Sequence, residues 1–317
     1  MGTTTGRRHR TGTTHGLRWL TVVLVMALAP ALAACTSGSA GAGAVTTPTA
    51  RATPTVRATP TVRATPTLEP ERDVVVAGRH LKARCAGSGP SVVLVADYGL
   101  AMDDAWGTIP QTLATRGRVC VYDRLGIGRS DSVPDRQTFA SLADDLDGVI
   151  SGLGLTRPVV VLGLAMGAPI VLTWMSRHES DAKAVVLLDP VPPGYFGPTG
   201  ALLRLLPPKD PSDPELGGVW ADLGRFNAVA TNKESLDPSS WTAYERLPVT
   251  STPLYDLVGA QVQPWPAAVD GSKIDGVWRQ YQRRVLALSS QAELRIVPKP
   301  DDWPATIRST LERALQS

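Results

Sequence analysis

Short apolar runs alternate with longer amphipathic stretches along most of this chain, and this alternation constrains its fold more than any other feature. From residue 72 onward the apolar runs have the length of strands, and most gaps between them carry apolar residues at helical spacing. This alternation is typical of an α/β protein whose helices cover a mostly parallel sheet. The sequence predicts eight strands, at 74–78, 81–85, 92–96, 119–122, 159–163, 185–188, 254–258 and 294–297. It predicts helices at 104–115, 138–153, 166–178, 276–288 and 304–315.

The first 35 residues predict an export signal. A basic start ending at Arg18 is followed by an apolar run over 19–34 and then by Cys35. The run is short and contains Pro30, so it is a poor membrane-spanning helix. Residues 32–35, Leu-Ala-Ala-Cys, resemble a bacterial lipobox, whose cysteine thiol receives diacylglycerol. We expect a lipid on Cys35 to hold the exported chain at the outer face of the bacterial cytoplasmic membrane; the alternative is a plain secretory signal.

Residues 36–71 predict a disordered spacer. They hold three copies of a six-residue unit, Arg-Ala-Thr-Pro-Thr followed by Val or Leu, at 51–56, 57–62 and 63–68. The segment has too few large apolar residues to fold, and one proline in each unit favours an extended chain. We interpret it as a spacer between the lipid and a folded domain at 72–317.

The positive charge of the chain lies in the leader and spacer. Residues 1–70 contain seven arginines and one acidic residue. Without them, the 32 basic and 29 acidic residues of the whole chain fall to 25 and 28. A slightly acidic domain lacks the electrostatic footprint of a nucleic-acid-binding protein, so we expect no nucleic-acid partner.

An insert at about 191–252 interrupts the alternation. It holds nine prolines together with several aromatic residues, among them Tyr195, Trp220, Trp241 and Tyr244. We interpret this insert as a cap over one edge of the sheet.

Three segments together resemble the α/β-hydrolase superfamily, and the resemblance covers most of 73–317. The segment at 121–130, Val-Tyr-Asp-Arg-Leu-Gly-Ile-Gly-Arg-Ser, resembles the loop that follows the family's fourth strand. The segment at 161–167, Val-Leu-Gly-Leu-Ala-Met-Gly, has the strand, sharp turn and helix layout of the nucleophile elbow. Residues 278–289 and 294–298 resemble the helix and last strand that present the catalytic histidine. The resemblance implies an eight-stranded, mostly parallel sheet flanked by helices.

The same resemblance places the catalytic triad at positions that lack the usual side chains. The elbow tip is Ala165, which has no nucleophilic atom, and the histidine position falls on Asp301 or Asp302. The position after 254–258 offers Gln261 instead of an acid, and Asp189 is the one candidate at the family's alternative acid position. We therefore predict a degenerate site with no expected catalytic residue.

Backbone groups of the oxyanion hole can survive the loss of a triad. The resemblance places them at Tyr98, Gly99 and Met166, and the sequence leaves open whether their N–H groups still point into the site. His80 lies near a strand turn and His178 ends a helix; we interpret both as structural.

The three cysteines divide into Cys35 and a pair. In an exported protein the remaining two, Cys85 and Cys120, are expected to form a disulfide. The resemblance makes their two strands neighbours in the sheet, which makes this pairing geometrically plausible. We expect neither a metal nor a cofactor, because acidic pairs such as 144–145 have no histidine or cysteine partner at ligand spacing.

Two main hypotheses follow for function. The first is a surface-anchored, catalytically inactive relative of the α/β hydrolases that binds a small apolar ligand or a protein partner under the cap. The second is an active esterase- or peptidase-like hydrolase with a displaced nucleophile, such as Ser239 or Ser240. A third hypothesis makes the domain purely structural.

Overall fold

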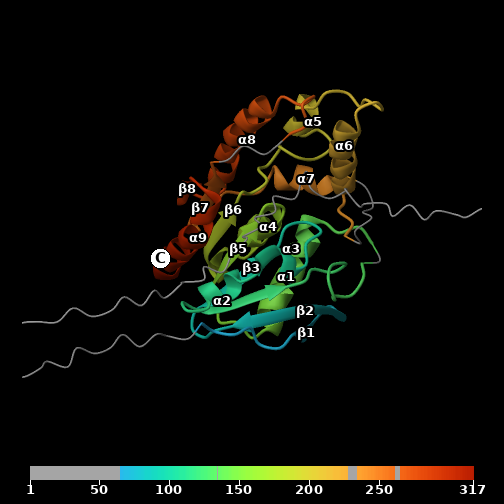
Figure 1. Cartoon of the computed structure of the whole chain (residues 1–317). Helices are drawn as coiled ribbons and strands as arrows, with labels where there is room; N and C mark the ends of the chain where they lie inside the picture. The colour runs from blue at the N-terminus through green and yellow to red at the C-terminus, as the bar shows by residue number, and fades with distance from the viewer. Residues whose placement is uncertain (1–64, 134, 228–233, 261–264) are drawn as a thin grey trace, which may run out of the picture.

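The computed structural model describes residues 65–133, 135–227, 234–260 and 265–317 (Figure 1). The predicted signal, Cys35, most of the spacer and Gln261 lie outside these residues. Within them, every helix is too short or too polar to cross a bilayer.

One eight-stranded sheet forms the centre of the molecule, in the order β1-β2-β4-β3-β5-β6-β7-β8. From β4 to β8 neighbouring strands run parallel, whereas β2 is antiparallel to both β1 and β4. The eight-stranded, mostly parallel sheet predicted from the sequence is therefore confirmed. Its strands are β1 (Arg72–Val76), β2 (Arg79–Ala86), β3 (Ser91–Val95), β4 (Arg118–Tyr122), β5 (Val159–Leu164), β6 (Ala182–Leu188), β7 (Leu254–Gly259) and β8 (Ala292–Val297).

Helices cover both faces of this sheet. Helices α3, α4 and α8 contribute to the buried cluster on one face, and α1, α2 and α9 contribute to the cluster on the other. The central strands β3 and β5 are buried along their whole length, as expected of parallel strands covered on two sides. The helices outside the cap are α1 (Met102–Trp106), α2 (Ile109–Leu113), α3 (Phe139–Gly152), α4 (Gly167–Arg177), α8 (Gly271–Leu286) and α9 (Trp303–Gln316).

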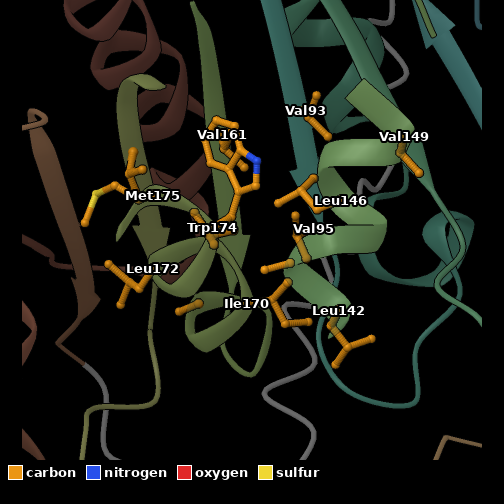
Figure 2. Close-up of a cluster of buried hydrophobic side chains, with 14 of the residues drawn as sticks. Val93, Val95, Leu142, Leu146, Val149, Val161, Ile170, Leu172, Trp174 and Met175 are labelled. Atoms are coloured by element: carbon orange, nitrogen blue, oxygen red, sulfur yellow. The ribbon is translucent and has the colours of Figure 1, made fainter. Parts of the chain in front are cut away.

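Figure 2 shows how the first face is packed. Valines of β3 and β5 point toward a layer made by α3 and α4, and Trp174 of α4 lies in that layer, completely buried. The layer fixes α4 against the sheet, and α4 begins directly after the sharp turn that ends β5. Packing of this face therefore determines where the turn presents its residues.

Cys85 and Cys120 form a disulfide that joins β2 to β4. The two residues are register partners in the antiparallel pair of these strands. The predicted pairing is confirmed. Just ahead of β1, Glu69 donates its main-chain N–H to the Cys85 carbonyl and pairs its carboxylate with Arg118, so this end of the predicted spacer already contacts the domain.

The described part of the insert between β6 and β7 forms three helices at one end of the sheet (Figure 1). They are α5 (Ala201–Leu205), α6 (Pro214–Asn227) and α7 (Ser239–Tyr244). Apolar residues of α5 and α6 form a separate cluster that also includes Val269 and Ile274, which come after β7, whereas Trp241 and Tyr244 of α7 belong to the core cluster on one face of the sheet. Residues that follow β7 therefore pack together with the insert predicted as the cap.

Two of the predicted helices differ from the structure. The helix predicted at 104–115 is divided into α1 and α2, because Gly107 has a φ of 48° and Pro110 starts a new turn. The helix predicted to start at 276 starts at Gly271, where Asp270 accepts a hydrogen bond from the Lys273 N–H and caps it.

Candidate functional site

The turn between β5 and α4 has the geometry of a nucleophile elbow. Ala165 at its tip has a φ of 44°, a left-handed conformation that is strained for a residue with a side chain. Gly163 and Gly167 lie on either side of the tip, where the neighbouring backbone leaves no space for a side chain. A Cβ on Gly167 would lie 2.5 Å from the Val95 carbonyl oxygen, and one on Gly163 would lie 3.1 Å from the Cα of Ala168. The elbow is therefore intact, but it presents a methyl group.

Two backbone N–H groups converge beside this tip. Met166 N–H and Tyr98 N–H both donate to Oδ1 of Asp97, at 3.0 and 2.8 Å. These are two of the three groups that the resemblance assigned to an oxyanion hole, and they do point at one place. The third, Gly99, donates its N–H to Glu234 at 2.7 Å instead. The structure thus assembles a hole for one oxygen atom and fills it with the chain's own carboxylate.

The environment of Asp97 opposes its charge. The residue is 4% exposed, and burial raises the pKa of its carboxyl to about 6 even though two N–H groups and the nearby Arg124 favour the ionised form. Asp97 is ionised at neutral pH and gains a proton in mildly acidic solution. Its carboxylate forms no ion pair with another described residue, because the Arg124 guanidinium binds its main-chain oxygen.

Arg124 and Glu234 clamp the loop that carries Asp97. Arg124 donates to the main-chain oxygens of Ala96 and Asp97 at 2.7 and 2.8 Å, and its Nε lies 2.7 Å from Glu234 Oε1. Both charged side chains are at most 3% exposed. Glu234 belongs to the cap, and its other oxygen accepts the Gly99 N–H. This buried pair therefore joins the cap, the loop after β3 and the loop after β4 at one point.

Two further carboxyls are buried: that of Asp189, which directly follows β6, and that of Asp256 in β7. Asp189, with a φ of 44°, accepts the Gly259 N–H at 2.7 Å, and burial raises its pKa to about 6. Asp256 is completely buried, and neither of its carboxyl oxygens has a partner among the described residues. Burial, with the nearby Asp189 charge, raises the pKa of Asp256 well above its usual value. Asp189 is thus a residue that ties two strand ends together.

The positions expected for a catalytic histidine, 301 and 302, hold aspartates. Asp301 and Asp302 lie in a short 3-10 turn, Pro300–Asp302, directly before α9, and Asp301 is exposed. His80 is an exposed residue of β2 whose Nδ1 is 3.9 Å from Asp73. His178 caps the end of α4 and stacks on Trp174. His9 and His15 lie outside the described residues.

The serines proposed as displaced nucleophiles have structural roles. Ser240 is buried between α7 and α3, where its Oγ accepts the Phe139 N–H at 3.4 Å. Ser239 donates its main-chain N–H to Asp237 at the start of α7. No imidazole contacts either hydroxyl within the described part of the chain.

Among the described residues, Asp147, His178 and Asp181 are close enough together to hold a metal ion. Sequence analysis missed this group because its members come from α3 and from the turn that follows α4, which are far apart in the sequence. Arg157 already supplies a cation there, with nitrogens 2.8 Å from Asp147 and 2.9 Å from Asp181. We interpret it as an ion-pair network. The acidic pair at 144–145 is likewise partly structural, since Asp145 is buried and lies 2.9 Å from Arg79.

Comparison with known proteins agrees with this geometry. Residues 92–234 match the family model described as "alpha/beta hydrolase fold". A thermophilic esterase from Thermogutta terrifontis superposes with a TM-score of 0.52 at 18% identity, covering 78% of this chain and 99% of the esterase, which shows a shared fold. These matches show that the domain has the α/β-hydrolase fold.

Curated relatives match only part of their length. A non-heme haloperoxidase from Rhodococcus erythropolis is 36% identical over 183 residues, which are 56% of this chain and 60% of that protein. The uncharacterized protein YqjL of Bacillus subtilis is 26% identical over 111 residues, which are 35% of this chain and 44% of YqjL. The chain therefore spans less than two thirds of the length of either relative.

Sequence reasoning missed Asp97, the residue that fills the hole. It lies between Ala96 and Tyr98, one position before the expected oxyanion loop, and a signal was available: an acidic residue directly after a strand that is buried along its length. Glu234 was also missed, because nothing in the cap sequence indicates that its carboxylate reaches Arg124.

Proposed function

We propose that this chain is a non-hydrolytic member of the α/β-hydrolase superfamily that binds a small molecule at the elbow. The observation that carries the proposal is the pair of hydrogen bonds from Tyr98 and Met166 to Asp97. An acyl substrate needs both N–H groups for the oxygen that becomes negative in the transition state. Here a fixed carboxylate competes for them, and it repels a second anion.

The elbow supports the same conclusion independently. Ala165 cannot attack a carbonyl, and neither Asp301 nor Asp302 is a histidine that could take a proton from a nucleophile. Loss of a catalytic triad typically lowers turnover about a million-fold. Retention of a strained elbow without a nucleophile favours a role in binding, because the left-handed tip costs stability and brings no chemistry.

We also propose that the chain is exported and lipid-anchored through Cys35. The disulfide between Cys85 and Cys120 supports an oxidising compartment. Metabolic labelling with a radioactive fatty acid, followed by membrane fractionation, tests the anchor. The wild-type chain is expected to carry label and to sediment with membranes, and Cys35→Ala is expected to lose both properties.

The hydrolytic alternative is tested directly on the purified full-length chain. We expect no labelling by a fluorophosphonate probe and no turnover of p-nitrophenyl acetate or butyrate above the rate in buffer. Labelling that is lost in Ser239→Ala or Ser240→Ala would establish a displaced nucleophile and overturn the proposal.

A further inference from the structure

The Asp97 carboxylate has one oxygen bound and one oxygen to offer. Both hydrogen bonds from the elbow and the loop end on Oδ1. The described residues donate no hydrogen bond to Oδ2. Both carboxyl oxygens of Asp256 are completely buried without a hydrogen-bond partner, but Oδ2 of Asp97 is not one of these inaccessible atoms. An acceptor atom that the fold leaves accessible beside the elbow tip is available to a ligand.

The charge of this carboxylate is also uncompensated by a cation. Arg124 is fully engaged with Glu234 and two main-chain oxygens, so the Arg124 and Glu234 charges cancel each other. The N–H groups of Tyr98 and Met166 contribute dipoles but no net charge. A buried carboxylate without a cationic partner is costly, and a ligand that brings a positive charge removes that cost.

The surroundings of Oδ2 suit an apolar body. Ala165 and Met166 form the elbow beside it, and Val191 donates its N–H to the Ala165 carbonyl at 3.3 Å. Met166 and Val191 belong to the apolar cluster on one face of the sheet, and the partly buried aromatic rings of Tyr98 and Phe196 pack against that cluster. Aromatic rings and aliphatic groups accommodate the carbon skeleton of an organic cation.

We infer that Asp97 inverts the polarity of the family's oxyanion site, so that the site selects organic ammonium compounds over carbonyl compounds and carboxylates. This inference rests on the proposed non-hydrolytic function and names its ligand class. The ammonium group donates a hydrogen bond to Oδ2 while Oδ1 remains bound to the two N–H groups. Ligand charge, rather than ligand reactivity, decides binding.

The test compares three probes with the same six-carbon chain, hexylammonium, hexanol and hexanoate, by calorimetric titration of the full-length chain at pH 7.5. Hydrogen bonds to charged groups predict that hexylammonium binds about ten- to a hundredfold more tightly than hexanol. Hexanoate is expected to bind most weakly. Equal binding of the three probes, a preference for hexanoate, or binding of none of them would overturn the inference.

Asp97→Asn is the matched variant, because the amide oxygen can still accept both N–H groups while the charge is lost. It is expected to lower hexylammonium affinity to that of hexanol, whereas the exposed Asp104→Asn leaves it unchanged. Undiminished hexylammonium binding by Asp97→Asn would contradict the inference.

A pH titration of the wild-type chain gives a readout that needs no variant at residue 97. Glu234, Arg124 and Tyr98 are the charged or titratable groups that face Asp97. Hexylammonium binding is expected to weaken as the pH falls through about 6, where Asp97 gains a proton. Burial also raises the pKa of Asp189 to about 6, so its titration must be distinguished from that of Asp97. The variant Asp189→Asn is expected to retain the loss of hexylammonium binding near pH 6. A step lost in Asp189→Asn, or absent from the wild type, would argue against Asp97.

Failure here is distinguishable from failure of the proposed function. Ester turnover by the wild-type chain would overturn the non-hydrolytic proposal whatever the amines do. Absence of both turnover and amine selectivity would overturn the ligand class alone.

Discussion

Oδ1 of Asp97 lies 3.0 Å from the main-chain nitrogen of Met166, which is hydrogen-bonding distance from the residue that follows the elbow tip. In active α/β hydrolases the corresponding N–H is one of the two that stabilise an oxyanion. The proposed non-hydrolytic function rests on three features of the site. Ala165 stands at the nucleophile position, Asp301 and Asp302 stand where the base is expected, and Asp97 accepts the N–H groups expected at the oxyanion hole.

The occupied hole predicts that restoring the triad alone will fail. Ala165→Ser combined with Asp302→His, or with Asp301→His, is expected to give no p-nitrophenyl ester turnover, because Asp97 still competes for the hole. Adding Asp97→Gly is expected to raise kcat by at least about a hundredfold, the usual contribution of an oxyanion-hole donor.

Asp97→Gly in the wild-type background is the control for this series. It is expected to leave turnover at the buffer rate, since an open hole without a nucleophile cannot form an acyl intermediate. Equal turnover in the restored chain with and without Asp97→Gly would show that the carboxylate does not block the hole.

The Arg124 and Glu234 pair predicts a large loss of stability when one partner is removed. Glu234→Ala leaves the guanidinium buried without its counterion, and we expect the free energy of unfolding in urea to fall by about 3 to 5 kcal/mol. The matched control is Glu312→Ala, because Glu312 pairs with Arg116 at 2.7 Å on the surface, where their side chains are 35% and 53% exposed. That control is expected to cost less than about 1 kcal/mol. Similar losses of stability in both variants would mean that burial of the Arg124 and Glu234 pair does not determine its contribution to the free energy of unfolding.

The disulfide predicts a second stability difference. Cys85 and Cys120 are 35 residues apart, and closing a loop of this length stabilises the native state by about 3 to 4 kcal/mol in the chain-entropy description. The double variant Cys85→Ala with Cys120→Ala is expected to unfold at correspondingly lower urea concentration. Reductant is expected to move the wild-type midpoint toward that of the variant and to leave the variant unchanged. The variant Cys35→Ala, whose substitution lies outside the predicted folded domain at 72–317, is expected to unfold at the same urea concentration as the wild type.

The elements that could be predicted from sequence are those determined by local pattern. The strand at 159–163 is a continuous apolar run, and the glycines at 163 and 167 indicate a close approach of helix and strand. The sequence therefore predicts both the elbow and the sheet. The division of the helix predicted at 104–115 was harder, because apolar periodicity continues through Gly107 while the backbone does not. The cap helices were not predicted, because prolines and short lengths hide their periodicity.

The electrostatic part of the site could not be predicted in the same way. Asp97 acts on Met166, 69 residues away, and Arg124 pairs with Glu234, 110 residues away. Such contacts depend on the side-chain directions that the finished fold imposes, and no local pattern encodes them. A triad resemblance shows which groups are missing, but it does not show what has replaced them.

Asp256 predicts that one substitution will stabilise the protein in a pH-dependent way. Its ordinary pKa is 3.8, and burial without a partner raises the pKa well above that value in the native state. Above pH 4 the unfolded chain releases this proton while the native chain keeps it, so the contribution of Asp256 to the free energy of unfolding falls as the pH rises. Asp256→Asn removes the penalty. We expect it to raise the free energy of unfolding at pH 8 by more than about 1 kcal/mol, the equivalent of one pKa unit. This gain is expected to shrink toward pH 4, where the acid is protonated in both states. Urea titrations of wild type and variant at pH 4, 6 and 8 measure the difference, with the exposed Asp104→Asn as control. A gain that is constant across the three pH values would place the effect in packing rather than in proton binding.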